Sequence, residues 1–455
     1  MDRDFVVSSI GPATGLYAMS KPHVKHLLVG GGLAAASAAK AIRQLDSEGS
    51  VLLIGQETSR PYHRPPLSKQ FLRRQQRRED LFAIEPGWFE QNHVELRSGR
   101  RVAGLDVTRK AAVLDNGEEI SYDRLLLATG VSPKPLECPG STLPNVYYLR
   151  TVEDVDRLQN AIDKARNEGR PHAGGVAKPG GRGRVAVIGA GLLGVEVAAS
   201  LTQMGLAVDL LASGSHPWNR FAGESTGKFI GLFLERHGVT VHVNARPVRL
   251  EGDGRVQRVV INGAGPSAQS LDCDFAIACV GATVNKDLLR GTPIAAGKAI
   301  LVDDHCRTNI EGAYAAGDCC AILDPLFGKY RQLDHWDNAQ VTGTLAGRNM
   351  TGANERYRDV NYFFSDVFDL TLSAWGEARQ VDRRLMRGTP RIENGDFVEV
   401  GVSADGRVAQ VLAVRPSGES ADDDTLRELV GRRVRLNGNE ERLKDPRYPL
   451  SDLLQ

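Results

Sequence analysis

Two stretches of the chain share one order of elements: a short apolar run, a glycine turn and a segment rich in small apolar residues. The first reads HLLVGGGLAAASAA from His26, and the second reads RVAVIGAGLLGVEVAA from Arg184. The apolar runs predict buried strands, and the segments after the glycines predict helices. Glycines at such a turn let the backbone approach a pyrophosphate, whose charge the helix N-terminus attracts. Two such turns predict two dinucleotide sites in one chain.

The pattern around these turns predicts an α/β fold. The segment LLLATG from Leu125 is an apolar run that ends in glycine, and FAIACVG from Phe275 repeats this pattern. The pair Asn116-Gly117 predicts a hairpin turn, and Thr151 with Asp154 predicts the capped start of a helix over 151–165. We expect two Rossmann-like dinucleotide-binding domains, the second inserted in the first. Short alternating strands near the C-terminus predict an α+β interface domain.

The expected boundaries follow from these patterns. A disordered leader covers 1–23, in which Met19 is an alternative start. The first dinucleotide-binding domain is discontinuous and covers 24–135 and 284–360. The second covers 136–283 and contains a mobile, glycine-rich loop over 167–183. The interface or dimerisation-type domain covers 361–455.

Composition limits the classes of partner. The 455 residues carry a formal net charge of +1 and are 41% hydrophobic, so no global field favours nucleic acid or an anionic membrane. No apolar run reaches the ~18 residues of a spanning helix. The six cysteines lack metal-ligand spacing, which predicts free thiols, no metal site and a cytoplasmic location. We expect the adjacent Cys319 and Cys320 to be buried thiols, because neighbouring cysteines bridge only with strain.

The first glycine turn departs twice from the usual pattern. Ala35 replaces the third glycine, at a position that serves helix–strand packing rather than phosphate contact. About 20 residues later, where an acid usually binds ribose, the chain has Gln56 followed by Glu57. Gln56 can still bond a ribose hydroxyl, although less strongly than a carboxylate does.

Four further motifs follow in order: PYHRPPLSK from Pro61, LRTVED from Leu149, TNIEGAYAAGD from Thr308 and LDHWDNAQVTG from Leu333. Together with the glycine turns they resemble the FAD-dependent NAD(P)H reductases of the ferredoxin, putidaredoxin and rubredoxin reductase group, which are related to apoptosis-inducing factor. The resemblance extends from Val24 to the closing segment after Asp445. Disulfide reductases carry a redox cysteine pair where this chain has RPPLSK, so a dithiol mechanism is disfavoured.

The resemblance implies three catalytic residues. Lys69 would lie at the flavin ring near N5, Glu196 would be its acidic partner, and Trp336 would lie beside the ring and gate nicotinamide stacking. Such a lysine can stabilise negative charge on reduced flavin. From the residues alone, Lys69 could instead be a solvated lysine, Glu196 a helix-terminal acid and Trp336 a core tryptophan.

The resemblance also implies the residues that bind FAD. Asp318 would bond the ribityl chain, Arg150 would contact FAD, and the Val102 backbone would contact its adenosine part. The other residues expected at this site are Gly30, Gly32, Leu33, Ala34, Ala35, Gln56, Glu57, Arg64, Thr129, Gly130 and Gly317.

The second glycine turn is complete and is expected to bind NADH or NADPH. Relatives that use NADH carry a Glu near Ala212 or Ser213, which this chain lacks. Ser213, His216 and Arg220 could instead meet a 2′-phosphate, so the choice of nicotinamide stays open. The residues expected at this site are Gly189, Gly191, Leu192, Leu193, Gly194, Glu196, Ser213, Arg220 and Gly281.

The expected function is hydride transfer from NAD(P)H to FAD and electron transfer to an external acceptor, in first place a [2Fe–2S] ferredoxin of an oxygenase system. A basic helix near 67–78 could dock that acidic carrier through Arg73, Arg74, Arg77 and Arg78, or could be a solvated face paired with acids. Two alternatives stay open: an oxidoreductase like apoptosis-inducing factor without a dedicated ferredoxin, indicated by RNMTG from Arg348, and a redox-sensing interaction protein. A homodimer is also open.

Overall fold

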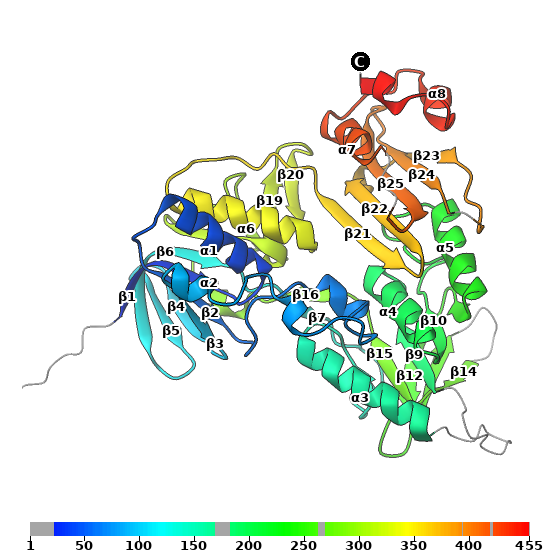
Figure 1. The fold of residues 1–455 in the computed structure, drawn as a ribbon, viewed down its shortest axis with the longest axis horizontal. Coiled ribbons are helices and arrows are strands. Elements are labelled where there is room, and N and C mark those ends of the chain that lie inside the picture. Colours follow the sequence, from blue (N-terminus) through cyan, green and yellow to red (C-terminus); the bar gives the residue numbers. More distant parts are fainter. Residues whose placement is uncertain (1–21, 169–182, 263–268, 394, 419–421, 455) are drawn as a thin grey trace, which may run out of the picture.

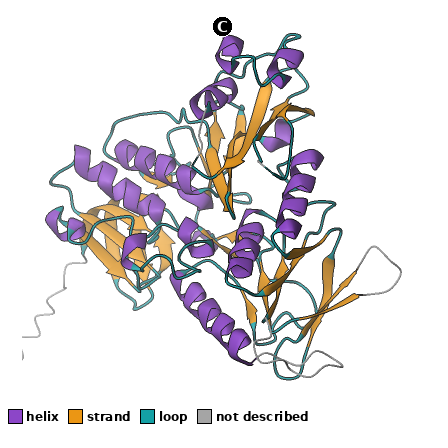
Figure 2. Cartoon of the chain, turned by 45° about the vertical axis from the view of Figure 1, so that its right-hand side comes forward, coloured by secondary structure: helices purple, strands orange, loops and turns teal. Residues whose placement is uncertain are grey.

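The structure is a computed structural model that describes residues 22–168, 183–262, 269–393, 395–418 and 422–454. The leader expected over 1–23 and the loop expected over 167–183 therefore lie almost wholly outside the described residues. Figures 1 and 2 show three lobes, each built around its own sheet. No helix of the described ranges is long and apolar enough to cross a membrane.

The first lobe contains a seven-stranded sheet. Its parallel part has the order β3-β2-β1-β6, with β18 added beside β6. Buried leucines of β1 and β6 pair in register, such as Leu27 with Leu125, because both faces of this parallel sheet are covered. The antiparallel strands β5 and β4 extend β6. The bounds are β1 His23–Val29, β2 Val51–Gly55, β3 Val94–Ser98, β4 Val102–Asp106, β5 Ala111–Leu114, β6 Glu119–Leu127 and β18 Ala313–Ala315.

Two helices from distant parts of the sequence pack on this sheet: α1 (Leu33–Leu45) and α6 (Trp336–Met350). They cross with their backbones in contact. A Cβ atom on Gly343 would overlap the carbonyl oxygen of Ala34, and one on Gly347 would lie 2.5 Å from that of Ala38. This contact fixes the N-terminus of α6 beside the N-terminus of α1. A short helix α2 (Trp88–Gln91) precedes β3.

The second lobe is a doubly wound unit with five parallel strands in the order β11-β10-β9-β15-β8. Its helices are α3 (Val152–Glu168), α4 (Leu192–Gln203) and α5 (Glu224–Arg236). An antiparallel sheet of β12, β13 and β14 extends the lobe, and the antiparallel pair β7 and β16 joins it to the first lobe. The bounds are β7 Val131–Pro133, β8 Val146–Tyr147, β9 Arg184–Ile188, β10 Ala207–Leu211, β11 Val239–His242, β12 Arg246–Glu251, β13 Arg258–Asn262, β14 Gln269–Asp272, β15 Phe275–Ala278 and β16 Ala282–Val284.

The third lobe is a five-stranded antiparallel sheet in the order β21-β22-β25-β24-β23. Its edge strand β21 packs against both α4 and α6, so the sheet closes the gap between the other two lobes. Helices α7 (Asp423–Gly431) and α8 (Glu440–Lys444) pack on it. The bounds are β21 Tyr362–Val367, β22 Leu370–Gly376, β23 Arg383–Gly388, β24 Phe397–Val402 and β25 Val408–Pro416. A small sheet of β17 (Ile300–Val302), β19 (Cys320–Asp324) and β20 (Lys329–Gln332) lies before α6.

The α/β fold with two dinucleotide-type units and a third domain is the fold predicted from the sequence. One predicted helix is wrong. Over 67–78 the chain forms a single 3₁₀ turn, Pro65–Ser68, followed by irregular turns. Lys69 leaves helical geometry with φ −125° and ψ −115°, and Arg74 has φ +61°. The tertiary contacts of the Lys69 side chain, described below, outweigh the favourable helix propensities of the Leu, Lys, Gln and Arg residues in this segment.

The contact between α1 and α6 gives a stability prediction. Gly343→Ala forces a side-chain atom into the Ala34 carbonyl and should lower the free energy of unfolding by about 1–3 kcal/mol. Gly297→Ala is the matched control, because nothing lies within 4 Å of the Cβ position there. Urea denaturation measures both. Equal stabilities of the two variants would show that the helices are not in backbone contact.

Candidate cofactor site between the lobes

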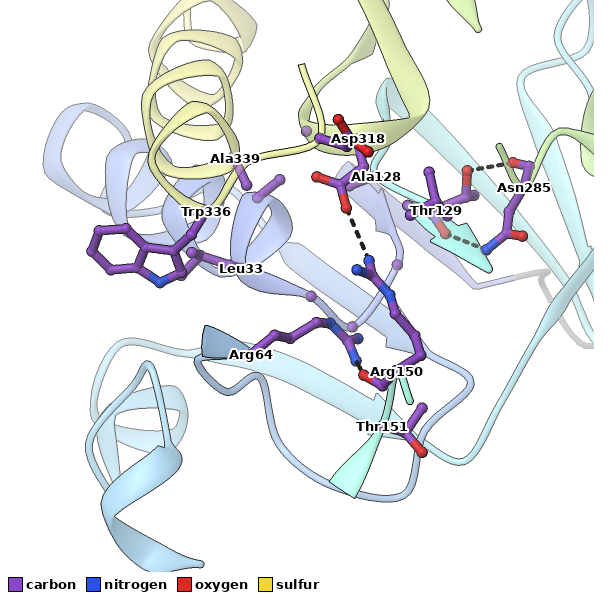
Figure 3. A pocket seen from close by; sticks show the side chains of 18 of the residues that line it. Leu33, Arg64, Ala128, Thr129, Arg150, Thr151, Asn285, Asp318, Trp336 and Ala339 are labelled. Atoms are coloured by element: carbon purple, nitrogen blue, oxygen red, sulfur yellow. Dashed lines mark hydrogen bonds and ion pairs between the residues drawn. The ribbon is translucent and has the colours of Figure 1, made fainter. Parts of the chain in front are cut away.

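A cavity of about 720 Å³ lies where the three lobes meet. Its walls come from both glycine-turn helices, from the loops after β6 and β18, and from β21 of the third lobe. Figure 3 shows part of this cavity, with Arg64 and Arg150 near each other and Trp336 beside Leu33. Of the residues predicted for the first site, those lining the cavity are Gly30, Gly32, Leu33, Ala34, Gln56, Glu57, Arg64, Lys69, Val102, Thr129, Gly130, Arg150, Gly317, Asp318 and Trp336.

The first glycine turn opens onto this cavity. Gly30 has φ +130°, and a Cβ there would overlap the Ala128 carbonyl, so only glycine fits. Gly32 is the N-cap of α1 and gives it no side-chain cap, and no atom lies within 4 Å of its Cβ position. The first N–H groups of α1 therefore face open space, as a phosphate site requires. Ala35 is fully buried and serves packing.

The two candidate ribose residues differ in their partners. The Glu57 carboxylate forms an ion pair with Arg64 at 2.6 Å and accepts a hydrogen bond from the Tyr62 hydroxyl. Burial raises the pKa of Tyr62, so its hydroxyl stays a donor. Gln56 is exposed at the cavity wall. Glu57 is thus held by the protein, and the Gln56 side chain extends towards solvent.

Arg150 links two walls of the cavity. Its Nη2 lies 2.9 Å from Asp318 Oδ2, and its carbonyl accepts a 2.6 Å hydrogen bond from Arg64 Nη1. Thr129 is fixed by a reciprocal pair of bonds with Asn285. These contacts orient Asp318 and Arg150 before any ligand binds, which lowers the entropy cost of binding.

Lys69 and Glu196 meet in the cavity wall. Lys69 Nζ lies 3.2 Å from Glu196 Oε1, and both side chains are buried. A second carboxylate, Asp366 on β21, lies closer, with Oδ2 at 2.8 Å from Nζ. Sequence reasoning missed Asp366 because it lies 297 residues from Lys69 and carries no local signal. It also missed the aromatic wall of Tyr362, Phe363 and Phe364.

Trp336 begins α6 at one end of the cavity. Its Nε1 donates a 2.9 Å hydrogen bond to His63 Nδ1, and its ring meets Phe364 edge to face. Burial, with a smaller effect of Lys40, lowers the pKa of His63, which favours the neutral ring that can accept this bond. Trp336 is therefore held in a fixed orientation.

The second glycine turn repeats the first. Gly191 caps α4 without a side-chain bond, and Gly189 has φ +111° where its Cβ would overlap the Cys279 carbonyl. Gly194 lies tight against the backbone of Gly189. Leu192 and Leu193 line the cavity beside Glu196, so the N-terminus of α4 adjoins the first site.

The candidate 2′-phosphate residues do not all face one surface. Ser213 and Arg220 are exposed, and Arg220 Nη1 lies 4.0 Å from the Cβ position of Gly281. His216 is buried: its Nδ1 contacts the Pro217 carbonyl and its ring packs on Gly227. The expectation for His216 is therefore wrong, because the ring fills the space under α5 and faces no ligand site.

The arginines proposed for docking are used within the protein. Arg74 pairs with Asp163 and Arg78 with Asp156, both on α3. Arg73 donates to Ser200 on α4, and Arg77 pairs with Asp80. No helix at 67–78 aligns these four side chains, and each of them has a partner within the protein. These contacts favour the alternative of a face paired with acids over that of a docking helix.

All six cysteines are free thiols, as predicted. Cys319 and Cys320 are buried, and their sulfurs bond backbone carbonyls of Leu127, Ala316 and Gly317. Burial raises the pKa of both thiols, and that of Cys279 to about 12. Thiolates are the reactive form, so these cysteines are unreactive. The described residues contain no cluster of His, Cys, Asp and Glu suited to a metal ion.

The structure contains two parallel-sheet units, and in each of them a helix without a side-chain cap follows a glycine turn. The N-termini of both helices adjoin one cavity. This arrangement defines the class of oxidoreductases that bind two dinucleotides. The chain belongs to the pyridine nucleotide-disulphide oxidoreductase family, whose model matches residues 24–343. The family relationship inferred from the motifs is thereby confirmed.

Relatives cover nearly the whole chain. The rubredoxin–NAD(+) reductase of Pseudomonas putida is 28% identical over 83% of this chain and 92% of its own length. The ferredoxin–NAD(+) reductase component of a biphenyl dioxygenase system from Paraburkholderia xenovorans is 29% identical over 94% and 98%. Among solved structures, the covalent putidaredoxin reductase–putidaredoxin complex matches with a TM-score of 0.84 and 25% identity, covering 95% of this chain and 98% of that one.

The burial of the thiols gives a prediction. Iodoacetamide applied to the folded protein should leave Cys319 and Cys320 unmodified and its rate of nicotinamide oxidation unchanged, because both thiols are buried and burial raises their pKa. Peptide mass spectrometry locates the modified residues, and denatured protein is the control. Rapid loss of activity on modification of either cysteine would restore a dithiol mechanism.

Proposed function

We propose that this chain is an FAD-dependent reductase that oxidises a nicotinamide dinucleotide and passes the electrons to a small [2Fe–2S] ferredoxin. The observation that carries the proposal is the cavity, which joins both uncapped helix N-termini to the Lys69–Glu196 contact. Relatives along nearly the full length are named as ferredoxin or rubredoxin reductases, which supports the same acceptor class.

The first site fits FAD. The open N-terminus of α1 at Gly32 would hold the pyrophosphate, and Gln56 with Glu57 would bind the ribose. Asp318 and Arg150 would bind the ribityl region, and Val102 the adenosine part. Lys69, Glu196 and Trp336 would surround the reactive ring. When bound, the flavin supplies a two-electron acceptor for hydride and a one-electron donor to a metal centre.

The chain's own residues position and insulate this chemistry. Leu192, Leu193 and Phe364 supply apolar lining to the cavity, which would keep water away from the bound rings. The positive charge of Lys69 favours the negative charge that accumulates on hydride transfer. Since the described cysteines form no disulfide, electrons would leave at the cavity edge near Trp336 rather than through one.

The alternative of an oxidoreductase without a dedicated ferredoxin rests on RNMTG from Arg348. In this chain that segment ends α6 and has structural contacts. Arg348 pairs with Glu355, and the buried Asn349 donates to the carbonyls of His305 and Glu355. These contacts give the segment a packing role, so it favours neither acceptor.

The proposed acceptor is tested by steady-state kinetics. With NADH or NADPH in excess, the purified protein should reduce a [2Fe–2S] ferredoxin, followed by the bleaching of the ferredoxin in visible light. Ferricyanide serves as the control for an intact flavin. Fast ferricyanide reduction with no reduction of any [2Fe–2S] carrier would reject the ferredoxin as acceptor and leave only the oxidation of the nicotinamide.

We further propose that the nicotinamide site accepts a 2′-phosphate. The strand β10 is followed by Ala212 and Ser213 with no acid to repel a phosphate, and Arg220 lies exposed near Gly281. Arg220→Ala should lower kcat/KM for NADPH by about tenfold, or ~1.4 kcal/mol, and leave NADH within about twofold.

Arg236→Ala is the matched control, because this exposed arginine lies at the far end of α5. It should change neither value. A wild-type preference for NADH above about a hundredfold, or ~2.7 kcal/mol, would contradict the phosphate site.

A further inference from the structure

The Lys69 ammonium contacts two carboxylate groups, and the closer one belongs to a residue of the third lobe. Asp366 Oδ2 lies 2.8 Å from Nζ, and Glu196 Oε1 lies at 3.2 Å. Asp366 is itself fixed, since its Oδ1 accepts a 2.8 Å bond from the Thr371 hydroxyl on β22. Lys69 and Glu196 line the cavity. Asp366 is one-third exposed and contacts the Lys69 ammonium without lining the cavity.

Glu196 is held mainly by hydroxyl groups. Ser68 donates to its Oε2 at 2.5 Å, and Ser365 donates to its Oε1 at 2.7 Å. Serine hydroxyls can rotate to donate to a carboxylate or to accept from a carboxylic acid, so they suit both protonation states. Burial raises the pKa of Glu196, although Lys69 and the hydroxyls of Ser68 and Ser365 oppose this rise.

The charges around Glu196 are few. Lys69, on the 65–69 turn, contacts Glu196 directly, and Asp366, on β21, contacts the same ammonium. Arg73 lies one step away, bound to the Ser200 hydroxyl that donates to the Ser68 carbonyl. Two carboxylates and one ammonium carry a net charge of −1 when all are ionised, and 0 when one carboxyl holds a proton.

We propose that Asp366 is the counter-ion of Lys69, and that Glu196 is the proton-holding group of this cavity wall. Asp366 is thus a positioning residue, which acts through Lys69. The assignment reverses the expectation from sequence, in which Glu196 alone pairs with the lysine. It follows from the shorter Asp366 contact and from burial, because the Glu196 side chain is buried whereas that of Asp366 is one-third exposed.

The consequence for reactivity rests on the proposed function. With Glu196 protonated, the wall formed by Lys69, Glu196 and Asp366 is neutral. It then does not oppose the negative charge that a hydride brings to the cavity. As pH rises and Glu196 ionises, the wall carries −1 and opposes that charge. Wild-type reduction by nicotinamide should therefore slow by about tenfold across this ionisation.

The protonation of Glu196 is measured directly by infrared spectroscopy of the flavin-loaded protein, across the pH range in which it stays folded. A buried carboxylic acid gives a carbonyl band that disappears as it ionises. Glu196→Gln should abolish this band. Asp366→Asn should move its titration to lower pH by about one pH unit or more, because Lys69 then pairs with Glu196.

Two further variants separate charge from structure. Asp369→Asn removes the same charge from the exposed turn of the same hairpin and should titrate like the wild type. Asp366→Glu keeps the charge and should restore the wild-type titration. If the band of Asp366→Asn titrates as in the wild type, or if Glu196→Gln retains the band, the proposal is overturned.

Stopped-flow reduction by nicotinamide gives a second readout. Glu196→Gln leaves a neutral wall at every pH, because Lys69 keeps Asp366 as its partner, so it should flatten the wild-type pH profile, and Asp369→Asn should not. In Asp366→Asn the slope of the profile should move to lower pH together with the infrared titration. A profile of Asp366→Asn that slopes at the same pH as that of the wild type would contradict the charge assignment. Failure of nicotinamide to reduce the wild type at any pH would instead reject the proposed function, whatever the infrared result.

Discussion

A buried ammonium needs counter-charges, and this need joins the three lobes. The Lys69 side chain is only 4% exposed and lies on a turn of the first lobe. Its partners are Glu196 on α4 of the second lobe and Asp366 on β21 of the third. Without any carboxylate partner the ammonium would be an unpaired charge in a low-dielectric wall, which is costly. The cavity geometry therefore depends on all three lobes being docked.

The same constraint explains what could be predicted from the sequence. The glycine turns, the Asn116-Gly117 hairpin and the Thr151–Asp154 capping pair are local, and the structure contains each of them. The helix over 67–78 is absent because Lys69 turns inward to partners hundreds of residues away. Asp366 and the buried His216 have no local signal, since only the packing of distant elements determines their surroundings.

The chain belongs to a family named for disulphide chemistry, yet its described cysteines form no disulfide, and the adjacent Cys319 and Cys320 are buried. In the RPPLSK segment, Pro65, Ser68 and Lys69 line the cavity. A lysine with carboxylate partners can adjust the charge of a bound ring but cannot carry electrons. The cavity is thus built for electrons that enter from one dinucleotide and leave directly from the other.

The central claim is that two dinucleotides exchange electrons inside this cavity. Anaerobic titration with a nicotinamide dinucleotide, followed by visible absorbance, tests it most directly. The account predicts a yellow protein whose flavin absorbance bleaches completely with one equivalent of reduced nicotinamide. A protein that binds no flavin after reconstitution, or a bound flavin that nicotinamide does not bleach, would contradict it.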